Sequence, residues 1–544
     1  MDKPEKVYED YHFSIPPLAG AEIQFPAVNV QQDRKRRVSI VPLAGEKIVS
    51  LSSPARKLSD KQPKVKNNAN KKFTDETFNI TNGERLSSMK VEMAKKRFEV
   101  NGLQAHDVIQ GSLGDCWFLS ALSTLVDEGE GAPQYKLQNK IKTEIAEKVL
   151  QADRNSTEEA HAQGKYHFSF YNVSGWQEVK IDDRLPPSLS ASQSKDSEWW
   201  VPLAEKAYAK FHGGYGSLDG GNTNWSLTEL SGGISCELKN LASSLERVTN
   251  IELESVLLAI KDDSMICCSN LDDTNNSDEI KGLVSLHAYA VLRVERMALR
   301  TGEELTMIKL RNPWGSTEWT GKWADKDKDS WRKVRKREKK RIGFENKDDG
   351  SFWMTFEDWI KEFEIFNFCA LPHLDSNRED GPQSNKKDSF ISGFFKPGSS
   401  SPAIPSQLSK TFLESKFNAQ AYFEVTENII EEKKQTRLVW LQLLLDSKIT
   451  EKTQVIIDLY RISVKPKRKL EKEELKKARG SKVLPLIPFS RGYEIEIYKH
   501  NGYLFDLKPG KYLISFAACK EGKSDQFAWK LRAFGNDIKL NNLN

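Results

Sequence analysis

The sequence lacks the features of a membrane-spanning or secreted protein. No apolar run approaches the roughly 18–20 residues that a membrane-spanning helix needs, and the N-terminus has no hydrophobic core of a signal peptide. Only Cys267 and Cys268 lie close together among six cysteines, so neither a disulfide framework nor a zinc-binding spacing is present. We therefore expect reduced cysteines and a cytoplasmic location.

The chain also lacks a strong charge imbalance. Its 82 Lys and Arg residues against 77 Asp and Glu leave a formal net charge of +5 over 544 residues. So mild an excess does not indicate nucleic acid as a partner. The hydrophobic share of 38% and the charged share of 29% are typical of globular domains joined by polar linkers. The length exceeds what one hydrophobic core supports, so we expect three or four structural units.

Residues 110–122 carry the strongest chemical signal of the sequence. They read Gln-Gly-Ser-Leu-Gly-Asp-Cys-Trp-Phe-Leu-Ser-Ala-Leu, a Gly-rich turn that brings Cys116 to the start of an apolar helical run. The positive end of a helix dipole favours the thiolate, which is the nucleophile of cysteine hydrolases. Gln110 is spaced to stabilise an oxyanion beside the Cys116 N–H. The alternative interpretation is a structural cysteine buried before a core helix.

Two later segments contain the groups that such a nucleophile requires. His287 lies in the alternating run 286–294, and 308–315 predicts a strand that ends at Asn312 before a proline turn. An imidazole can take the thiol proton, and an amide carbonyl can fix the imidazole tautomer. A packed histidine and an ordinary Asn-Pro turn explain each residue singly. Together, the order Cys, distant His, then Asn is that of papain-like proteases.

Several segments then match one family in the same order. They are Gln-Gly-Ser-Leu-Gly-Asp-Cys-Trp at 110–117, Glu-Lys-Ala-Tyr-Ala-Lys at 205–210, His-Ala-Tyr at 287–289, Arg-Asn-Pro-Trp-Gly-Ser-Thr-Glu-Trp-Thr-Gly at 311–321 and Asp-Gly-Ser-Phe-Trp-Met at 349–354. Across roughly 75–375 the chain resembles the calpain family. The resemblance implies an α+β fold, with a papain-like two-part cysteine protease core followed by an all-β sandwich. It also implies an intracellular, calcium-dependent endopeptidase that makes limited cuts in protein substrates.

The resemblance assigns roles to five residues. By residue matching, Cys116 is the nucleophile, His287 the base and Asn312 the residue that orients the imidazole. Gln110 is the oxyanion helper. Trp314 matches a tryptophan that lies between the two halves of the core and moves when the site assembles.

Regulatory, non-catalytic calcium at two sites is also implied by the resemblance. The ligands of the first site are the carbonyls of Val100 and Gly102 and the side chains of Asp107 and Glu198. Those of the second site are Glu318, Asp325, Asp349 and the Lys347 carbonyl. Carboxylate and carbonyl oxygens are the ligands that calcium requires.

Three positions depart from the family pattern. Ser351 stands where a ligating Glu is usual, and Ala105 where an Arg that pairs with that Glu is usual. We therefore expect the first site to bind calcium more reliably than the second, and coupling between the halves to be weaker or to use other residues. Leu286 stands where Gly is common before the histidine, a change that leaves the triad chemistry untouched.

The sequence predicts five segments. Residues 1–75 are polar and without periodicity, which predicts disorder. The segment 76–220 forms the first half of the core with Cys116, and within it 165–182 predicts a hairpin and 198–211 a helix. The second half, 221–375, carries His287 and Asn312. Adjacent glycines at 220–221 provide backbone freedom for a hinge between the halves. A linker or loop-rich stretch, 376–409, precedes the short alternating strands of a calpain-type β-sandwich at 410–544.

Protein substrates are the expected partners, and other interactions stay open. Because the chain ends soon after the predicted strands, we expect no EF-hand domain and no EF-hand small subunit. The charged segment 465–482 is interpreted as a solvated loop or, alternatively, as a peripheral contact of the β-sandwich with anionic membranes.

Two other functions are not eliminated by the sequence. A transglutaminase-like acyltransferase also places a Gly-rich turn before Cys-Trp, but it normally uses Asp where this chain has Asn312. A calcium-responsive, non-catalytic scaffold would keep the fold without the activity. The intact Cys116 and His287 disfavour a scaffold, whereas Ala105 and Ser351 keep it open.

Overall fold

The computed structural model describes the parts of the chain that form the core and the C-terminal sheets. The main described ranges are 103–126, 140–150, 164–186, 198–239, 250–262, 264–270, 281–371, 389–395, 418–425, 437–445, 453–463, 500–520 and 527–534; the short ones are 74–75, 77–78, 84–85, 192–193, 465–466, 482–483 and 540–542. Most of the predicted segments 1–75 and 376–409 and of the charged segment 465–482 lies outside these ranges.

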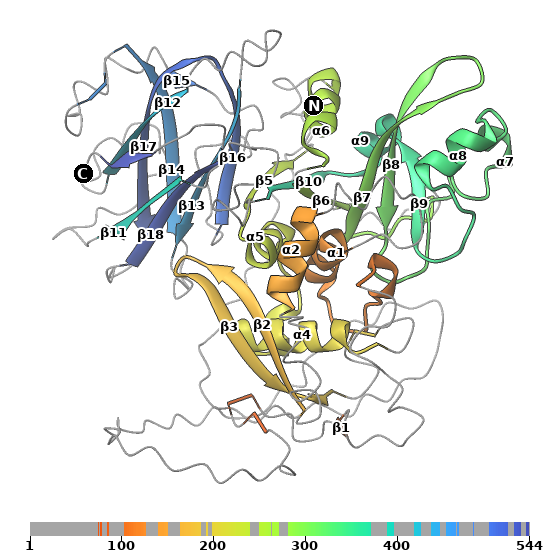
Figure 1. Ribbon diagram of the computed structural model, residues 1–544, viewed down its shortest axis with the longest axis horizontal. Helices are drawn as coiled ribbons and strands as arrows, with labels where there is room; N and C mark the ends of the chain where they lie inside the picture. Colours follow the sequence, from red (N-terminus) through yellow and green to blue (C-terminus); the bar gives the residue numbers. More distant parts are fainter. Residues whose placement is uncertain are drawn as a thin grey trace, which may run out of the picture.

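The first half of the core is built from helices and a hairpin. The helices are α1 (Cys116–Leu125), α2 (Lys140–Val149), α4 (Trp200–Phe211) and α5 (Thr223–Ser231), with 3-10 turns at Ala105–Asp107 and Tyr215–Leu218. Helix α5 packs on α1 and is described with the first half, although the sequence predicts that residues 221–375 belong to the second. Strands β2 (Lys165–Asn172) and β3 (Gly175–Asp182) form the predicted hairpin, and β1 (Glu84–Arg85) pairs with β4 (Arg184–Leu185). Helices α2 and α5 lie beside α1 (Figure 1). None of the described helices is long and apolar enough to cross a membrane.

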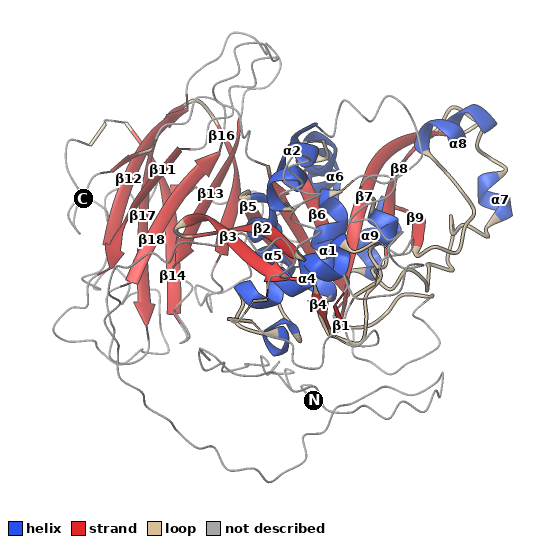
Figure 2. Ribbon diagram, turned by 60° about the horizontal axis from the view of Figure 1, so that its bottom comes forward, coloured by secondary structure: helices blue, strands red, loops and turns tan. Residues whose placement is uncertain are grey.

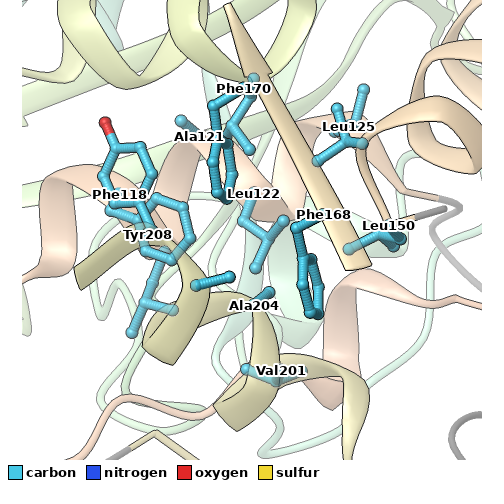
Figure 3. Packing of buried hydrophobic residues seen from close by; sticks show 14 of the residues in the cluster. Phe118, Ala121, Leu122, Leu125, Leu150, Phe168, Phe170, Val201, Ala204 and Tyr208 are labelled. Carbon is cyan, nitrogen blue, oxygen red and sulfur yellow. The ribbon is translucent and has the colours of Figure 1, made fainter. Parts of the chain in front are cut away.

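Helix α1 lies at the centre of the first hydrophobic cluster. Its residues from Trp117 to Leu125 are all buried, as expected of a helix that is packed on every side. The ring of Phe118 stacks on that of Tyr208 with centroids 4.1 Å apart, and Phe170 meets Tyr208 edge-on at 5.2 Å. Figure 3 shows these rings on one side of Leu122. This packing fixes the axis of α1, and with it the position of its first residue.

The second half is a six-stranded antiparallel sheet with helices around it. Its strands, in spatial order, are β5 (Ile234–Lys239), β10 (Ile365–Ala370), β6 (Ser264–Asn270), β7 (His287–Ala298), β8 (Glu304–Arg311) and β9 (Ser351–Thr355). The helices are α6 (Asn250–Ile260), α7 (Lys328–Trp331), α8 (Lys336–Ile342) and α9 (Phe356–Glu362). The predicted strands around His287 and before Asn312 are therefore confirmed as β7 and β8.

The two halves meet where α1 packs on strands β6 and β7. The Ser120 hydroxyl donates to the Ala288 carbonyl over 2.9 Å. The predicted hinge is joined to the turn before α1, because Gly220 N–H donates to the Gly114 carbonyl over 2.8 Å. A Cβ at Gly221 would lie 2.2 Å from Cε2 of Trp117, so no larger residue fits there without displacing the indole. The glycine pair thus serves close packing at the nucleophile turn.

Two antiparallel sheets follow the core. One has the order β11 (Ser389–Phe395), β18 (Phe527–Phe534), β13 (Arg437–Leu445), β16 (His500–Leu507); the other has β15 (Lys482–Val483), β14 (Thr453–Ile462), β17 (Gly510–Lys520), β12 (Asn418–Val425), β19 (Asn541–Asn542). The sheets lie side by side in both views (Figures 1 and 2). Arg532 of β18 donates to the carbonyls of Gly232 and Gly233 and to Gln442, which joins this unit to the core.

Candidate active site

Cys116 is the first residue of α1, as the sequence predicts. The Asp115 carbonyl accepts from the N–H groups of Phe118 and Leu119 at 2.9 and 3.1 Å, which closes the first turn. The N–H groups of the first residues in a helix have no acceptor within the helix. Cys116 as a residue is partly exposed, but its thiol is buried beside the main-chain groups of the first turn.

His287 and Asn312 are hydrogen-bonded to each other. Nε2 of His287 lies 2.8 Å from Oδ1 of Asn312, and both residues are buried. Oδ1 also accepts from the Trp314 N–H at 3.0 Å, and Nδ2 donates to the Thr317 carbonyl at 3.1 Å. These contacts fix the amide with its oxygen toward the ring. An oxygen can only accept here, so Nε2 carries the proton and Nδ1 is left as the base.

Main-chain contacts of the residue after His287 bring β7 beside Cys116. His287 begins β7, next to Ala288, whose main chain hydrogen-bonds Cys116 and whose carbonyl accepts from Ser120. Residues 171 positions apart in the chain are thus brought to one place by the packing of α1 on β7. A thiol and an imidazole in this relation can act as nucleophile and general base.

Trp314 covers the imidazole on the solvent side. Its ring centroid lies 4.9 Å from that of His287, and the residue is 42% exposed. The turn that carries it is tied to the other half, because Gln110 N–H donates to the Pro313 carbonyl over 2.8 Å. The indole therefore lies at the junction of the halves, as the resemblance implies.

The side chain of Gln110 is held inside the turn before α1. Its Nε2 donates to the Leu113 carbonyl over 2.7 Å, whereas its Oε1 is buried without a hydrogen-bond partner among the described residues. The amide therefore lies beside the nucleophile turn, with an N–H group directed to the Leu113 carbonyl. An oxyanion role for Gln110 requires its release from Leu113 when substrate binds.

Burial keeps the thiol and the imidazole neutral in this structure. It raises the pKa of Cys116 to about 11, although the Ala288 main chain acts in the opposite direction. It lowers the pKa of His287 to about 4, although the hydrogen bond that the ring donates to Asn312 acts in the opposite direction. The sequence leads us to expect that the helix dipole favours the thiolate. That expectation is wrong for this state, because removing the sulfur from water outweighs the dipole.

Sequence reasoning missed a pair of buried carboxyl groups next to the nucleophile. Asp115 and Glu205 are both buried, and the Ser192 N–H donates to Glu205 at 2.9 and 3.1 Å. Burial raises the pKa of Asp115 to about 7 and, together with the Asp115 charge, raises that of Glu205 well above its usual range. A protonated carboxyl in this pair avoids two buried charges. The sequence signal that could have pointed to this pair is Glu205, which is the first residue of the matched segment 205–210.

Arg311 also escaped the sequence analysis. It is 1% exposed and donates through Nη2 to the carbonyls of His106 and Val108, both at 3.0 Å. Through Nη1 it donates to the Asp349 carbonyl at 2.8 Å and the Ser351 hydroxyl at 3.3 Å. One guanidinium thus joins the loop that carries Asp107 to the loop that carries Asp349. Because Ala105 and Ser351 replace the usual Arg–Glu pair, the sequence leads us to expect that any coupling of the halves uses other residues. Arg311 lies at that junction.

Three residues of the predicted second calcium site lie together. Glu318 Oε1 accepts from the N–H groups of Asp349 and Gly350, and Asp325 Oδ2 accepts from the Lys347 N–H at 3.4 Å. Burial and the Glu318 charge raise the pKa of Asp325 to about 7. Asp325 Oδ1 is buried without a hydrogen-bond partner among the described residues. A hard cation would satisfy that oxygen and the crowded charges, so these residues fit calcium.

Half of the predicted first site can be located. Asp107 and Glu198 are buried; Asp107 accepts from the Gln104 N–H at 3.0 Å and Glu198 from the Trp200 indole at 2.9 Å. Val100 and Gly102 lie outside the described residues. Within the described ranges, no three acidic, histidine or cysteine side chains already converge on a single point as a metal site would require.

A family comparison agrees with this geometry. Residues 79–370, more than half of the chain, match the model of the calpain family cysteine protease. The chain belongs to the calpain family. Cys116, His287 and Asn312 all lie within the matched range.

Individual calpains match the same region. The chain is 37% identical to calpain-5 of Mus musculus over 292 residues, which is 51% of this chain and 44% of the relative. It is 32% identical to calpain-A of Drosophila melanogaster over 338 residues, 60% and 38% of the two chains. Identity to the calpain-2 catalytic subunit of Homo sapiens is 33% over 288 residues, 51% and 37%. The match therefore spans less than half the length of these calpains.

Proposed function

We propose that this calpain is a calcium-dependent cysteine endopeptidase of the cytoplasm that makes limited cuts in protein substrates. The observation that carries the proposal is the hydrogen bond of 2.8 Å between His287 Nε2 and Asn312 Oδ1. It leaves Nδ1 as the basic nitrogen of a residue whose neighbour Ala288 hydrogen-bonds Cys116 through its main chain, which supports a role as the base for that thiol. Membership in a family of cysteine proteases supports the same reaction.

The proposed reaction is acyl transfer in two steps. His287 Nδ1 takes the proton of the Cys116 thiol as the sulfur attacks the peptide carbonyl, and the C–N bond then breaks while the imidazolium gives its proton to the leaving amine. Water, deprotonated by His287, hydrolyses the thioester and regenerates the thiol. The Cys116 N–H donates to the oxyanion in both steps, together with Gln110 once it leaves the Leu113 carbonyl.

Calcium is proposed to act on the arrangement of the halves and to take no part in the chemistry. Glu318, Asp325 and Asp349 would hold it in the second half, and Asp107 and Glu198 in the first. Asp107 and Asp349 lie in the two loops that the Arg311 contacts join. When bound, the ion would neutralise the acidic groups and so change the balance of charges around this junction.

The two C-terminal sheets are proposed to form the calpain-type β-sandwich. The central strand β13 pairs antiparallel with β16 and β18, and its residues from Val439 to Leu443 are all buried, as expected of a strand covered on both faces. Contacts of Arg532 with the core suggest a supporting role for this unit.

The proposal is tested by hydrolysis of casein across a calcium titration. Calcium-dependent cleavage is expected, and Cys116→Ala should abolish it without unfolding the protein. Cleavage that survives in Cys116→Ala would remove the assigned nucleophile. Calcium binding without any cleavage would favour the non-catalytic scaffold, and incorporation of a primary amine into casein would favour the transglutaminase-like alternative.

A further inference from the structure

Leu286 has an unusual conformation for its residue type. Its φ angle is +53°, in the left-handed region that glycine adopts freely and that is strained for a bulky side chain. Its side chain contributes little to the core, because the residue is 59% exposed. A residue that is both strained and exposed stabilises the fold poorly, and such positions cluster at functional sites.

The position of Leu286 relates it to the imidazole. It directly precedes His287, at the start of β7. Trp314, whose ring lies 4.9 Å from that of His287, is the other large apolar residue that is exposed in the described part of the chain. Both exposed apolar residues therefore adjoin the same histidine, one in sequence and one in space.

The chemistry of His287 identifies what approaches it. After the C–N bond breaks, the imidazolium must reach the leaving amine, which belongs to the residue on the C-terminal side of the cut bond. Protein groups that adjoin the imidazole on its exposed side therefore lie nearest to that residue. An apolar side chain there would cover Leu286 and remove apolar surface from water.

We propose that Leu286 is a specificity-determining residue that favours an apolar substrate residue immediately C-terminal to the scissile bond. This inference rests on the proposed endopeptidase function. Glycine at position 286 would adopt the observed backbone angle without strain but would leave no apolar side chain for the substrate to contact. The leucine thus exchanges some stability for selectivity.

The test uses peptides that differ only in the residue after the cut bond, which is Leu, Gly or Asp. Mass spectrometry of the products identifies the bond that is cleaved. For the wild type with calcium, kcat/KM for the Leu peptide should exceed that for the Gly peptide about tenfold, the lower end of discrimination by an apolar contact. Leu286→Gly and Leu286→Asn should reduce this ratio to near one, because both residues tolerate the backbone angle but lack the apolar side chain. Leu286→Met is the matched control and should keep most of the preference.

The variants also separate selectivity from folding. Thermal unfolding of Leu286→Gly should occur at the same temperature as in the wild type or higher, since strain is relieved. A ratio near ten in both Leu286→Gly and Leu286→Asn would overturn the inference while leaving the proposed function intact. Equal losses on all three peptides would also overturn it, because they would indicate a structural role. A wild type that cleaves no peptide or protein at any calcium level would instead contradict the proposed function, and the inference with it.

Discussion

At the scale of single residues, the surroundings of Cys116 favour the neutral forms of the ionisable side chains. Burial disfavours the thiolate, the imidazolium and the carboxylate of Asp115 alike. A charge that forms during the proposed reaction is therefore costly until substrate or a rearranged site compensates for it. The resting protein would then react slowly with adventitious electrophiles, and control of the thiol would come from the arrangement around it.

The raised pKa of Asp115 predicts how stability varies with pH. Its pKa rises from 3.8 to about 7 on folding, so between these values the folded state binds more protons than the unfolded state. The free energy of unfolding must then fall as pH rises through this window. Asp115→Asn should show a smaller fall in thermal midpoint between pH 4.5 and 7 than the wild type.

A matched control isolates this effect. Asp329→Asn removes a carboxyl whose side chain is 87% exposed and should keep the slope of the wild type. An Asp115→Asn slope equal to that of the wild type would show that the Asp115 carboxyl does not hold its proton in the folded state.

At the scale of elements, the end of β8 connects the halves of the core. Asn312 and Arg311 are adjacent, yet one faces the imidazole and the other reaches the 105–108 and 349–351 loops. Side chains of neighbouring residues leave a strand in opposite directions. A single strand end thus serves both the orientation of His287 and the joining of the 105–108 and 349–351 loops.

Arg311→Met should weaken this junction. It leaves carbonyls of His106, Val108 and Asp349 without their donor, so we expect a loss of about 3 kcal/mol in the free energy of unfolding, since a hydrogen bond to a charged group contributes about 1.5–3 kcal/mol. The calcium concentration for half-maximal casein cleavage should also change. Urea unfolding and calcium titration measure the two effects.

Arg332→Met is the control, because that guanidinium is 76% exposed and pairs only within its own turn through the contact with Asp329. A calcium midpoint in Arg311→Met identical to that of the wild type would mean that the guanidinium stabilises the fold without coupling the halves.

The same elements show how far sequence reasoning reaches. The hairpin, α1, β7 and β8 were predictable because local periodicity and turn residues determine them. Cys116, His287 and Asn312 were found because each begins or follows such an element. Arg311 was missed because its acceptors on the first half lie 203 and 205 positions away, and the pairing of Asp115 with Glu205 likewise arises from tertiary packing. The pKa of Cys116 depends on burial, which no local pattern gives.

At the scale of the whole molecule, the proposed site exists only where the two halves of the core meet. The halves are held by apolar packing of α1 against strands β6 and β7, in a cluster that includes Met265 and Cys267. Polar contacts add to this packing: Gln110 with Pro313, Ser120 with Ala288, and the fork of Arg311. Polar contacts can be exchanged at modest cost, whereas packed apolar groups cannot. A regulator that acts on the polar contacts would therefore change the arrangement around the site without unfolding either half.

The central claim is that His287 activates Cys116 across this junction under the control of calcium. The measurement that tests it most directly is the rate of Cys116 alkylation by iodoacetamide at pH 7, followed by peptide mapping, with and without calcium, in the wild type and in His287→Ala. The raised pKa of the thiol predicts slow alkylation without calcium. Calcium should accelerate it at least about tenfold in the wild type, the effect of lowering the thiol pKa by one unit, and not in His287→Ala. Equal rates in the two proteins at saturating calcium would contradict the account.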